Sequence, residues 1–243
     1  MPMNEPTSEP LTQELLRKAA ILRMFAEGFA YPETGHRERM LQACARIEAT
    51  LDGNDTAVRD LLHAVSSAWR NADPARLAPE YFRLFLGNGP VSLHETAYGD
   101  GRRIAGRAVE LADINGFYHA FGFEVSAQEP DLPDHVGTET EFYSLLLVKQ
   151  AYAQASGWSE KCEITHSAAR TFLEQHLGRW VDALAASLRE HNGASPYRGH
   201  TEALETWLKR ECGHLGVQPI LLERRLPDDA IQAETFVCPQ ANH

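Results

Sequence analysis

Hydrophobic residues recur at steps of three and four positions along most of the chain, which is the spacing of one buried helical face. The clearest case is the stretch 11–30, where Leu15, Leu22, Phe25 and Phe29 share a face. The same pattern predicts helices over residues 11–30, 36–51, 58–69, 79–86, 102–121, 133–156, 160–191 and 202–215.

Apolar and polar residues nowhere alternate over a stretch long enough to indicate a β-sheet. The predicted fold is therefore all-α, a single globular and bundle-like domain held by helix-on-helix packing. We expect this domain to occupy residues 11–226. The polar, proline-rich residues 1–10 are predicted to be disordered, and residues 227–243 to form a polar tail.

Helix ends are indicated by glycine and proline. Gly122 suits a left-handed cap after the helix 102–121. Pro133 suits the first turn of the next helix, where its missing N–H costs nothing, with Asp131 or Leu132 as the capping residue.

The net charge of the 243 residues is -11 at pH 7, which repels nucleic acid and anionic membranes and attracts basic peptides or cations. No apolar run approaches the roughly 20 residues that span a bilayer. The start of the chain lacks the basic and apolar regions of a signal peptide. The cysteines form no C-x-x-C pair and indicate a reducing cytoplasm; they are Cys44, Cys162, Cys212 and Cys238.

Acidic residues gather in one part of the sequence. From Ala108 to Val148 there is no lysine or arginine. The acidic residues of this stretch are Glu110, Asp113, Glu124, Glu129, Asp131, Asp134, Glu139 and Glu141. We interpret this stretch as the working surface of the protein.

Histidine and carboxylate side chains in this stretch have the chemistry of a metal or proton-transfer site. His135 and Glu139 are i,i+4 neighbours on a helix, next to Asp134. One alternative is therefore a helical metal-dependent hydrolase or oxidase, whose residues would be His94, Glu95, Asp134, His135 and Glu139.

Simpler interpretations of the same acids remain open. Acidic residues are favoured in the first turn of any helix because they offset the positive end of its dipole. The H-E-x-x-H zinc motif is absent, and Gly87-Asn88-Gly89-Pro90 lacks the ending of a phosphate-binding loop. A third reading is a structural assembly subunit with a solvated acidic face. The residues alone favour binding of a basic or amphipathic peptide over catalysis.

Three blocks, in this order, resemble the TorD/DmsD/NarJ-like family of maturation chaperones for molybdenum enzymes. The first runs from Glu80-Tyr81-Phe82-Arg83-Leu84-Phe85 through Gly87 and Pro90 to His94-Glu95-Thr96-Ala97-Tyr98. The second is Tyr118, Phe121-Gly122-Phe123, Pro133-Asp134-His135-Val136 and Glu141-Phe142. The third is Phe172-Leu173, His176-Leu177 and Trp180. The chain departs from the family pattern at His94, Thr96 and Tyr143.

This resemblance implies a TorD-like fold and a cytoplasmic, non-catalytic chaperone without cofactor or metal. It implies binding of the N-terminal twin-arginine signal, or the apo form, of a molybdopterin-dependent oxidoreductase, and assistance with cofactor insertion before export. The implied partner is the catalytic subunit of that enzyme, without nucleic acid or membrane insertion; a homodimer is compatible with the architecture.

Physical chemistry suggests how such a peptide would bind. Asp134, with Glu129, Asp131 and Glu95, could take guanidinium groups in charge-assisted hydrogen bonds. The apolar part of the signal would lie in an aromatic groove. The groove residues would be Tyr81, Phe85, Tyr98 and Phe142. His135 would orient the Asp134 carboxylate or make binding depend on pH.

Overall fold

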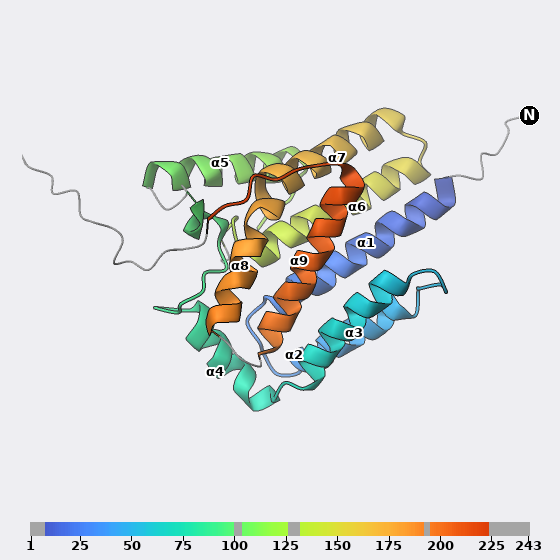
Figure 1. Cartoon of the computed structure of the whole chain (residues 1–243). Helices are drawn as coiled ribbons and strands as arrows, with labels where there is room; N and C mark the ends of the chain where they lie inside the picture. Colours follow the sequence, from blue (N-terminus) through green and yellow to red (C-terminus); the bar gives the residue numbers. More distant parts are fainter. Residues whose placement is uncertain (1–7, 100–103, 126–131, 192–194, 224–243) are drawn as a thin grey trace, which may run out of the picture.

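Helices form nearly all of the regular structure in a computed structural model that describes residues 8–99, 104–125, 132–191 and 195–223 (Figure 1). The elements are α1 (Ser8–Gly28), α2 (His36–Glu48), α3 (Thr56–Arg70), α4 (Pro74–Phe85), the 3-10 turn η1 (Glu95–Ala97), α5 (Ile104–Ala120), α6 (Val136–Ala155), α7 (Ser159–Phe172), the π-helical turn η3 (Leu173–Leu177), α8 (Gly178–His191) and α9 (Pro196–Leu215). These residues contain no β-strand, only an isolated bridge. The predicted all-α class is confirmed.

Helices α1 and α6 pack side by side through the middle of the molecule (Figure 1). Both contribute fully buried side chains, among them Phe25 of α1 and Phe142 of α6. The Ser144 hydroxyl donates to the Ala19 carbonyl across this interface at 2.9 Å. One hydrophobic cluster extends from Leu15 to Val217, so the described helices share a single core.

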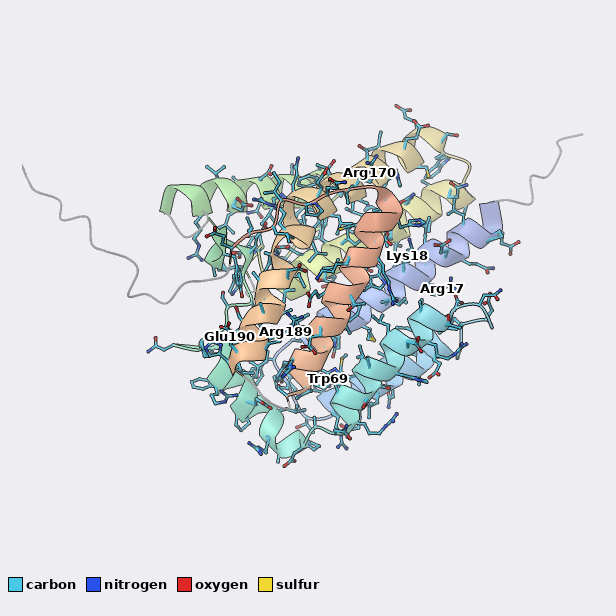
Figure 2. The ribbon with its side chains drawn as sticks, viewed as in Figure 1. Arg17, Lys18, Trp69, Arg170, Arg189 and Glu190 are labelled. Atoms are coloured by element: carbon cyan, nitrogen blue, oxygen red, sulfur yellow. The ribbon has the colours of Figure 1, made fainter. Side chains whose placement is uncertain are left out.

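Helix α9 reaches the same core through a buried histidine. His200 Nε2 hydrogen-bonds to the Phe25 carbonyl at 2.9 Å, and Trp69 Nε1 of α3 donates to His200 Nδ1 at 3.3 Å. Figure 2 shows Trp69 where α3 approaches the lower part of α9. This imidazole therefore ties three helices that lie far apart in the sequence. Burial lowers its pKa to about 4, so His200 is neutral at pH 7.

The boundaries of three predicted helices are wrong for local reasons. Helix α1 begins at Ser8 rather than at residue 11. Helix α4 begins at Pro74 rather than Pro79, because the Asp73 side chain accepts a hydrogen bond from Ala75 N and caps the helix. Helix α9 begins at Pro196, where the Ser195 hydroxyl provides the equivalent cap.

Two further differences concern the regions that carry the candidate site. Helix α6 begins at Val136 with His135 as its N-cap, so Pro133 lies in the preceding turn rather than in the first helical turn. The predicted helix 160–191 is interrupted by η3 between α7 and α8. By contrast, Gly122 has a φ of 63°, which confirms the predicted left-handed cap after α5.

Residues 1–7 and the predicted tail 227–243 lie outside the described residues, as does the capping candidate Asp131. Within the helices that are described, none combines the length and the hydropathy needed to cross a bilayer.

Gly28 gives a direct test of the packing of α9 against α1. A Cβ atom at this position would lie 2.2 Å from His200 Nε2. We expect Gly28→Ala to lower the free energy of unfolding by about 1–3 kcal/mol, because the ring has to move within a packed core. Urea denaturation measures the change.

Gly116 in α5 provides the matched control, because a Cβ atom there meets nothing within 4 Å. Gly116→Ala should raise the free energy of unfolding by up to about 1 kcal/mol through helix propensity. Equal effects of the two substitutions would contradict the close approach of His200 to Gly28.

Candidate functional site

The loop at residues 91–98 lies against the start of α6, which brings the first two sequence blocks together. Two backbone hydrogen bonds join them, from Glu95 N to Asp134 O at 2.9 Å and from Val136 N to Leu93 O at 2.8 Å. His94 and His135 pair between these bonds as an isolated antiparallel bridge. Segments about 40 residues apart thus form one corner, which backbone hydrogen bonds hold together.

Asp134 is fully buried in this corner and is surrounded by hydrogen-bond donors. Its Oδ2 accepts from Thr96 Oγ1 at 2.5 Å and from Thr96 N at 3.2 Å, and its Oδ1 lies 3.2 Å from His94 Nδ1. Burial alone would raise the pKa of Asp134, but the hydrogen bonds from His94 and Thr96 outweigh it and hold the pKa below its usual value. Asp134 is therefore an ionised group that fixes the loop.

His135 caps α6 with its side chain. Its Nδ1 accepts a hydrogen bond from Gly137 N at 3.1 Å, which requires an unprotonated nitrogen. Burial lowers the pKa of His135 to about 3, and the neighbouring His94 adds to this effect. A Cβ atom at Gly137 would lie 3.1 Å from the same Nδ1, so a glycine leaves room for the imidazole.

Two further carboxyl groups, those of Glu95 and Glu139, are buried next to this corner, and Glu139 lies in the first turn of α6. Trp180 Nε1 donates to Glu139 Oε2 at 3.0 Å, and His176 Nδ1 lies 3.2 Å from Glu95 Oε2. The other oxygens, Glu95 Oε1 and Glu139 Oε1, are buried without a donor among the described residues. A proton shared between the two carboxyl groups satisfies both.

Glu139 is the member of this pair that holds the proton. Burial, followed by the negative charge of Glu95, raises the pKa of Glu139 well above its usual value. Burial also raises the pKa of Glu95, while its hydrogen bond with His176 acts in the opposite direction. Because His176 and Arg179 favour a charged Glu95 while the negative charge of Glu95 disfavours a charged Glu139, we assign the proton to Glu139, which donates to Glu95.

The π-helical turn η3 positions His176 beside Glu95 and α5. His176 Nε2 lies 3.3 Å from the Asp113 carboxylate. Ligand atoms of Glu95, Glu110 and His176 lie within 4.8 Å of one another, close enough to hold a metal ion. However, Arg179 Nη1 lies 3.2 Å from Glu110 Oε1 and already neutralises that carboxylate. A metal ion would have to displace the guanidinium, so we do not assign a metal to this cluster.

The structure therefore changes the predicted roles of Asp134 and Glu95. The sequence predicts that their carboxylates take guanidinium groups, but both are fully buried and have partners inside the protein. The residues of the metal-enzyme alternative also have partners inside the protein. His94 contacts Asp134, His135 caps α6, and Glu139 accepts from Trp180. Glu129 and Asp131, also predicted to bind peptide, lie outside the described residues.

The predicted aromatic groove is also different from the arrangement found. Tyr98 and Phe142 are buried core residues, and Tyr81 is 5% exposed with its hydroxyl donating to the Phe29 carbonyl at 3.0 Å. Phe85 is partly buried against the Tyr81 ring. Tyr98 packs on Trp180 and Phe142 on Phe172, so these four side chains line no common open groove.

An open cavity does lie beside the N-terminus of α6. Its volume is about 350 Å³, and His135 forms part of its wall. The other lining residues are Arg23, Ala26, Glu27, Ala30, Phe123, Glu124, Val125, Gly137, Thr138 and Glu141. Three glutamates and one arginine thus line one small cavity. The acidic stretch 108–148 contains Glu124 and Glu141, whereas Glu27 of α1 has no signal in the sequence that connects it with this site.

Comparison with known proteins gives one family and several relatives. The family model described as nitrate reductase delta subunit matches residues 49–186, more than half of the chain. The chlorate reductase assembly chaperone protein of Ideonella dechloratans is 31% identical over 166 residues, which are 63% of this chain and 83% of that protein. The selenate reductase assembly chaperone protein of Thauera selenatis is 32% identical over 153 residues, 60% and 76% of the two chains.

A more distant relative is the chaperone protein TorD of Aeromonas salmonicida, which is 25% identical over 173 residues. These residues are 70% of this chain and 75% of that protein. The family match runs from the end of α2 into α8, and so contains the loop, the start of α6 and η3.

The neutral His135 cap should make stability depend on pH. The unfolded chain takes up a proton near the ordinary histidine pKa of 6.5, but the folded protein does so only near 3. His135 therefore lowers the free energy of unfolding as pH falls from 6.5 towards 3, by up to about 1.4 kcal/mol per pH unit. Asparagine can cap without titrating, so His135→Asn should remove this contribution in urea denaturation across that range.

The exposed His63 is the control for this experiment, because His63→Asn removes a histidine that lies outside the core. The comparison uses the difference between each variant and the wild-type chain, since other groups titrate in the same range. A His135→Asn difference that does not vary with pH would show that His135 takes up its proton equally readily in the folded and unfolded chains, against the buried neutral cap.

The protonated Glu139 predicts the opposite pH dependence. Folding at neutral pH requires this carboxyl to take up a proton that the unfolded chain, with a pKa near 4.5, has released. Glu139 therefore lowers stability as pH rises above 4.5. Glutamine is neutral and keeps both an acceptor for Trp180 and a donor for Glu95. We expect Glu139→Gln to raise the free energy of unfolding at pH 7 by roughly 1–3 kcal/mol.

Glu163 of α7 is exposed and serves as the control, since Glu163→Gln should change stability little. Loss of stability in Glu139→Gln at pH 7, with the wild-type pH dependence retained, would mean that Glu139 is ionised in the fold.

Proposed function

The chain belongs to the nitrate reductase delta subunit family, and from this premise we propose that it is an assembly chaperone for a molybdenum-containing reductase. The observation that carries the proposal is the match over residues 49–186 together with two relatives above 30% identity that are named as assembly chaperones of chlorate and selenate reductases. The resemblance to the TorD/DmsD/NarJ-like family in the sequence is confirmed.

A chaperone rather than an enzyme is also the role that suits the site. The buried histidines and carboxylates each have a partner within the fold, so they stabilise one conformation instead of facing a substrate. The partner in this proposal is the catalytic subunit of the reductase. The chaperone would hold its apo form in the cytoplasm and assist insertion of the molybdopterin cofactor before export.

For the signal peptide, the proposed site is the cavity beside α6. Glu27, Glu124 and Glu141 line this cavity of about 350 Å³, and carboxylates suit the guanidinium group of an arginine. Glu27 already pairs with Arg39 at 2.9 Å, so Glu124 and Glu141 are the proposed partners of the peptide. Arg23 of the chain lies 3.5 Å from Glu141 and would exchange this partner for an incoming arginine. An exposed ion pair of this kind is weak, so the exchange costs little.

Asp134 and His135 act on this cavity indirectly in the proposal. Asp134 holds the loop 91–98 through Thr96, and His135 caps the helix that carries Glu141. They therefore position the wall of the cavity, and only His135 lines it directly. The aromatic residues Tyr98 and Phe142 support the same wall from the core.

Calorimetric titration with a synthetic twin-arginine leader tests the proposed peptide site. The double variant Glu124→Gln/Glu141→Gln should weaken binding about tenfold or more, because two charge-assisted contacts are lost. The leader with both arginines changed to lysine should lose affinity for the wild-type chain, because lysine cannot make the bidentate contact. Added salt should weaken the wild-type interaction.

The control variant is Glu163→Gln, which removes an exposed acid on α7. A leader that binds the double variant and the wild-type chain equally would refute the site, although the chaperone role would stand. The absence of binding to any leader, together with the absence of a complex with the apo-reductase, would refute the role itself.

A further inference from the structure

A second and larger cavity lies between α1 and α2, outside the family match for most of its length. Its volume is about 850 Å³. We call it the α1–α2 groove, and it is lined by Gln13, Leu16, Arg17, Ala20, Arg23, Met24, Glu27, Arg39, Gln42, Ala43, Arg46, Ile47 and Thr50. Of these residues, Arg23 and Glu27 also line the cavity beside α6.

The floor of the α1–α2 groove is apolar. Met24 and Ile47 are buried, and Leu16 leaves 47% of its surface exposed to solvent. The small side chains of Ala20 and Ala43 leave the hollow between the two helices. A partner that covers this apolar floor removes it from water, which stabilises the complex.

The rims of the groove are basic, although the whole chain has a charge of -11. The lining contains four arginines and one glutamate. Three arginines contact one carboxylate each, in the pairs Arg17–Asp55 at 2.7 Å, Arg23–Glu141 at 3.5 Å and Arg39–Glu27 at 2.9 Å. Arg46 makes no ion pair or hydrogen bond with the residues that the structure describes.

The length of the groove, its apolar floor and its basic rims indicate what kind of partner fits it. Gln13 and Glu27 mark its extent along α1, and the 14 helical steps between them span about 21 Å. An α-helix of similar length can place an apolar stripe on the floor and carboxylates beside the rims. A bare anion or a nucleic acid would leave the apolar floor uncovered, and the net charge of the chain repels nucleic acid.

We propose that the α1–α2 groove binds an acidic amphipathic helix of a partner protein. Leucine-like side chains of this helix pack on Leu16, Met24 and Ile47. Glutamate or aspartate side chains beside them contact Arg46 and share the other arginines with their present partners. This groove adjoins the cavity beside α6 and shares Arg23 and Glu27 with it, while its other lining residues are distinct.

The test uses a fluorescein-labelled synthetic peptide of about 14 residues, with leucines at i, i+3, i+7 and i+10 and glutamates flanking them. Fluorescence anisotropy measures its binding to the full-length protein. We expect micromolar affinity that falls about tenfold with added salt, because exposed charges are screened. Arg46→Glu should weaken binding about tenfold or more, and Leu16→Glu should weaken it further.

The matched control is Arg170→Glu, which makes the same charge change on α7. Figure 2 shows Arg170 on α7 and Arg17 on α1, at well separated places on the molecule. Because Arg46 and Arg170 are both exposed, neither substitution disturbs the core. Circular dichroism confirms that each variant remains helical before binding is measured.

Three results would overturn the proposal. The first is equal binding of a scrambled peptide of the same composition, which would remove the role of the apolar stripe. The second is an equal effect of Arg46→Glu and Arg170→Glu, which would indicate non-specific charge attraction. The third is no measurable binding of the helical peptide to the wild-type chain. Arg46 and Leu16 lie outside the lining of the cavity beside α6, so leader binding to Arg46→Glu and Leu16→Glu distinguishes failure of this proposal from failure of the proposed peptide site.

Discussion

Three carboxyl groups are buried beneath the first turns of α6, and the way in which each is neutralised determines the structure around it. An unpaired charge inside a protein costs several kcal/mol. Asp134 stays ionised because Thr96 and His94 donate to it, whereas Glu139 keeps a proton and shares it with Glu95. The loop 91–98, the start of α6 and the π-turn therefore hold one another in place. Moving any one of them would leave a buried carboxyl group without its hydrogen-bond partner.

Apart from His135, the buried side chains that stabilise this corner are different from those that line the surface beside it. His135 and Glu139, whose pKa values burial shifts strongly, lie inside and hold the corner, while Glu124 and Glu141 line the cavity next to them. On the other side of α1 the surface is basic instead. Helix α1 thus contributes to two neighbouring regions of different charge, which meet at Arg23 and Glu27, and this difference favours one orientation of a partner protein on the chain.

The helical fold follows from the sequence because periodic apolar positions are local information. The errors occur where a capping side chain or a change of helix type sets the boundary. Pro133 is compatible with the first turn of a helix, yet the His135 imidazole caps α6 two residues later. The apolar stripe continues through residues 173–177, so nothing in it reveals that the hydrogen-bonding pattern changes there.

The sequence predicts that the segments around Glu95 and Asp134 belong together, but not what their side chains do. The blocks around Glu95 and Asp134 do meet, as their shared resemblance to one family implies. Acidic side chains next to proline normally lie in water, however, and the sequence does not show that Thr96, 38 residues away, buries Asp134. The same reasoning explains Tyr98 and Phe142, since an aromatic residue in a loop or helix fits a groove or a core equally well.

The π-turn η3 has a consequence for how the chain tolerates changes in length. A π-turn contains one residue more than the α-helical turn that it replaces. Deletion of a single residue from 173–177 would let α7 continue into α8 as regular α-helix, with Trp180 still on the face that meets Glu139. The same deletion at Arg179, where the helix has no extra residue to lose, would turn Trp180 by about 100° away from Glu139. The π-turn is therefore the place between α7 and α8 where the chain can lose one residue while Glu139 keeps its tryptophan partner.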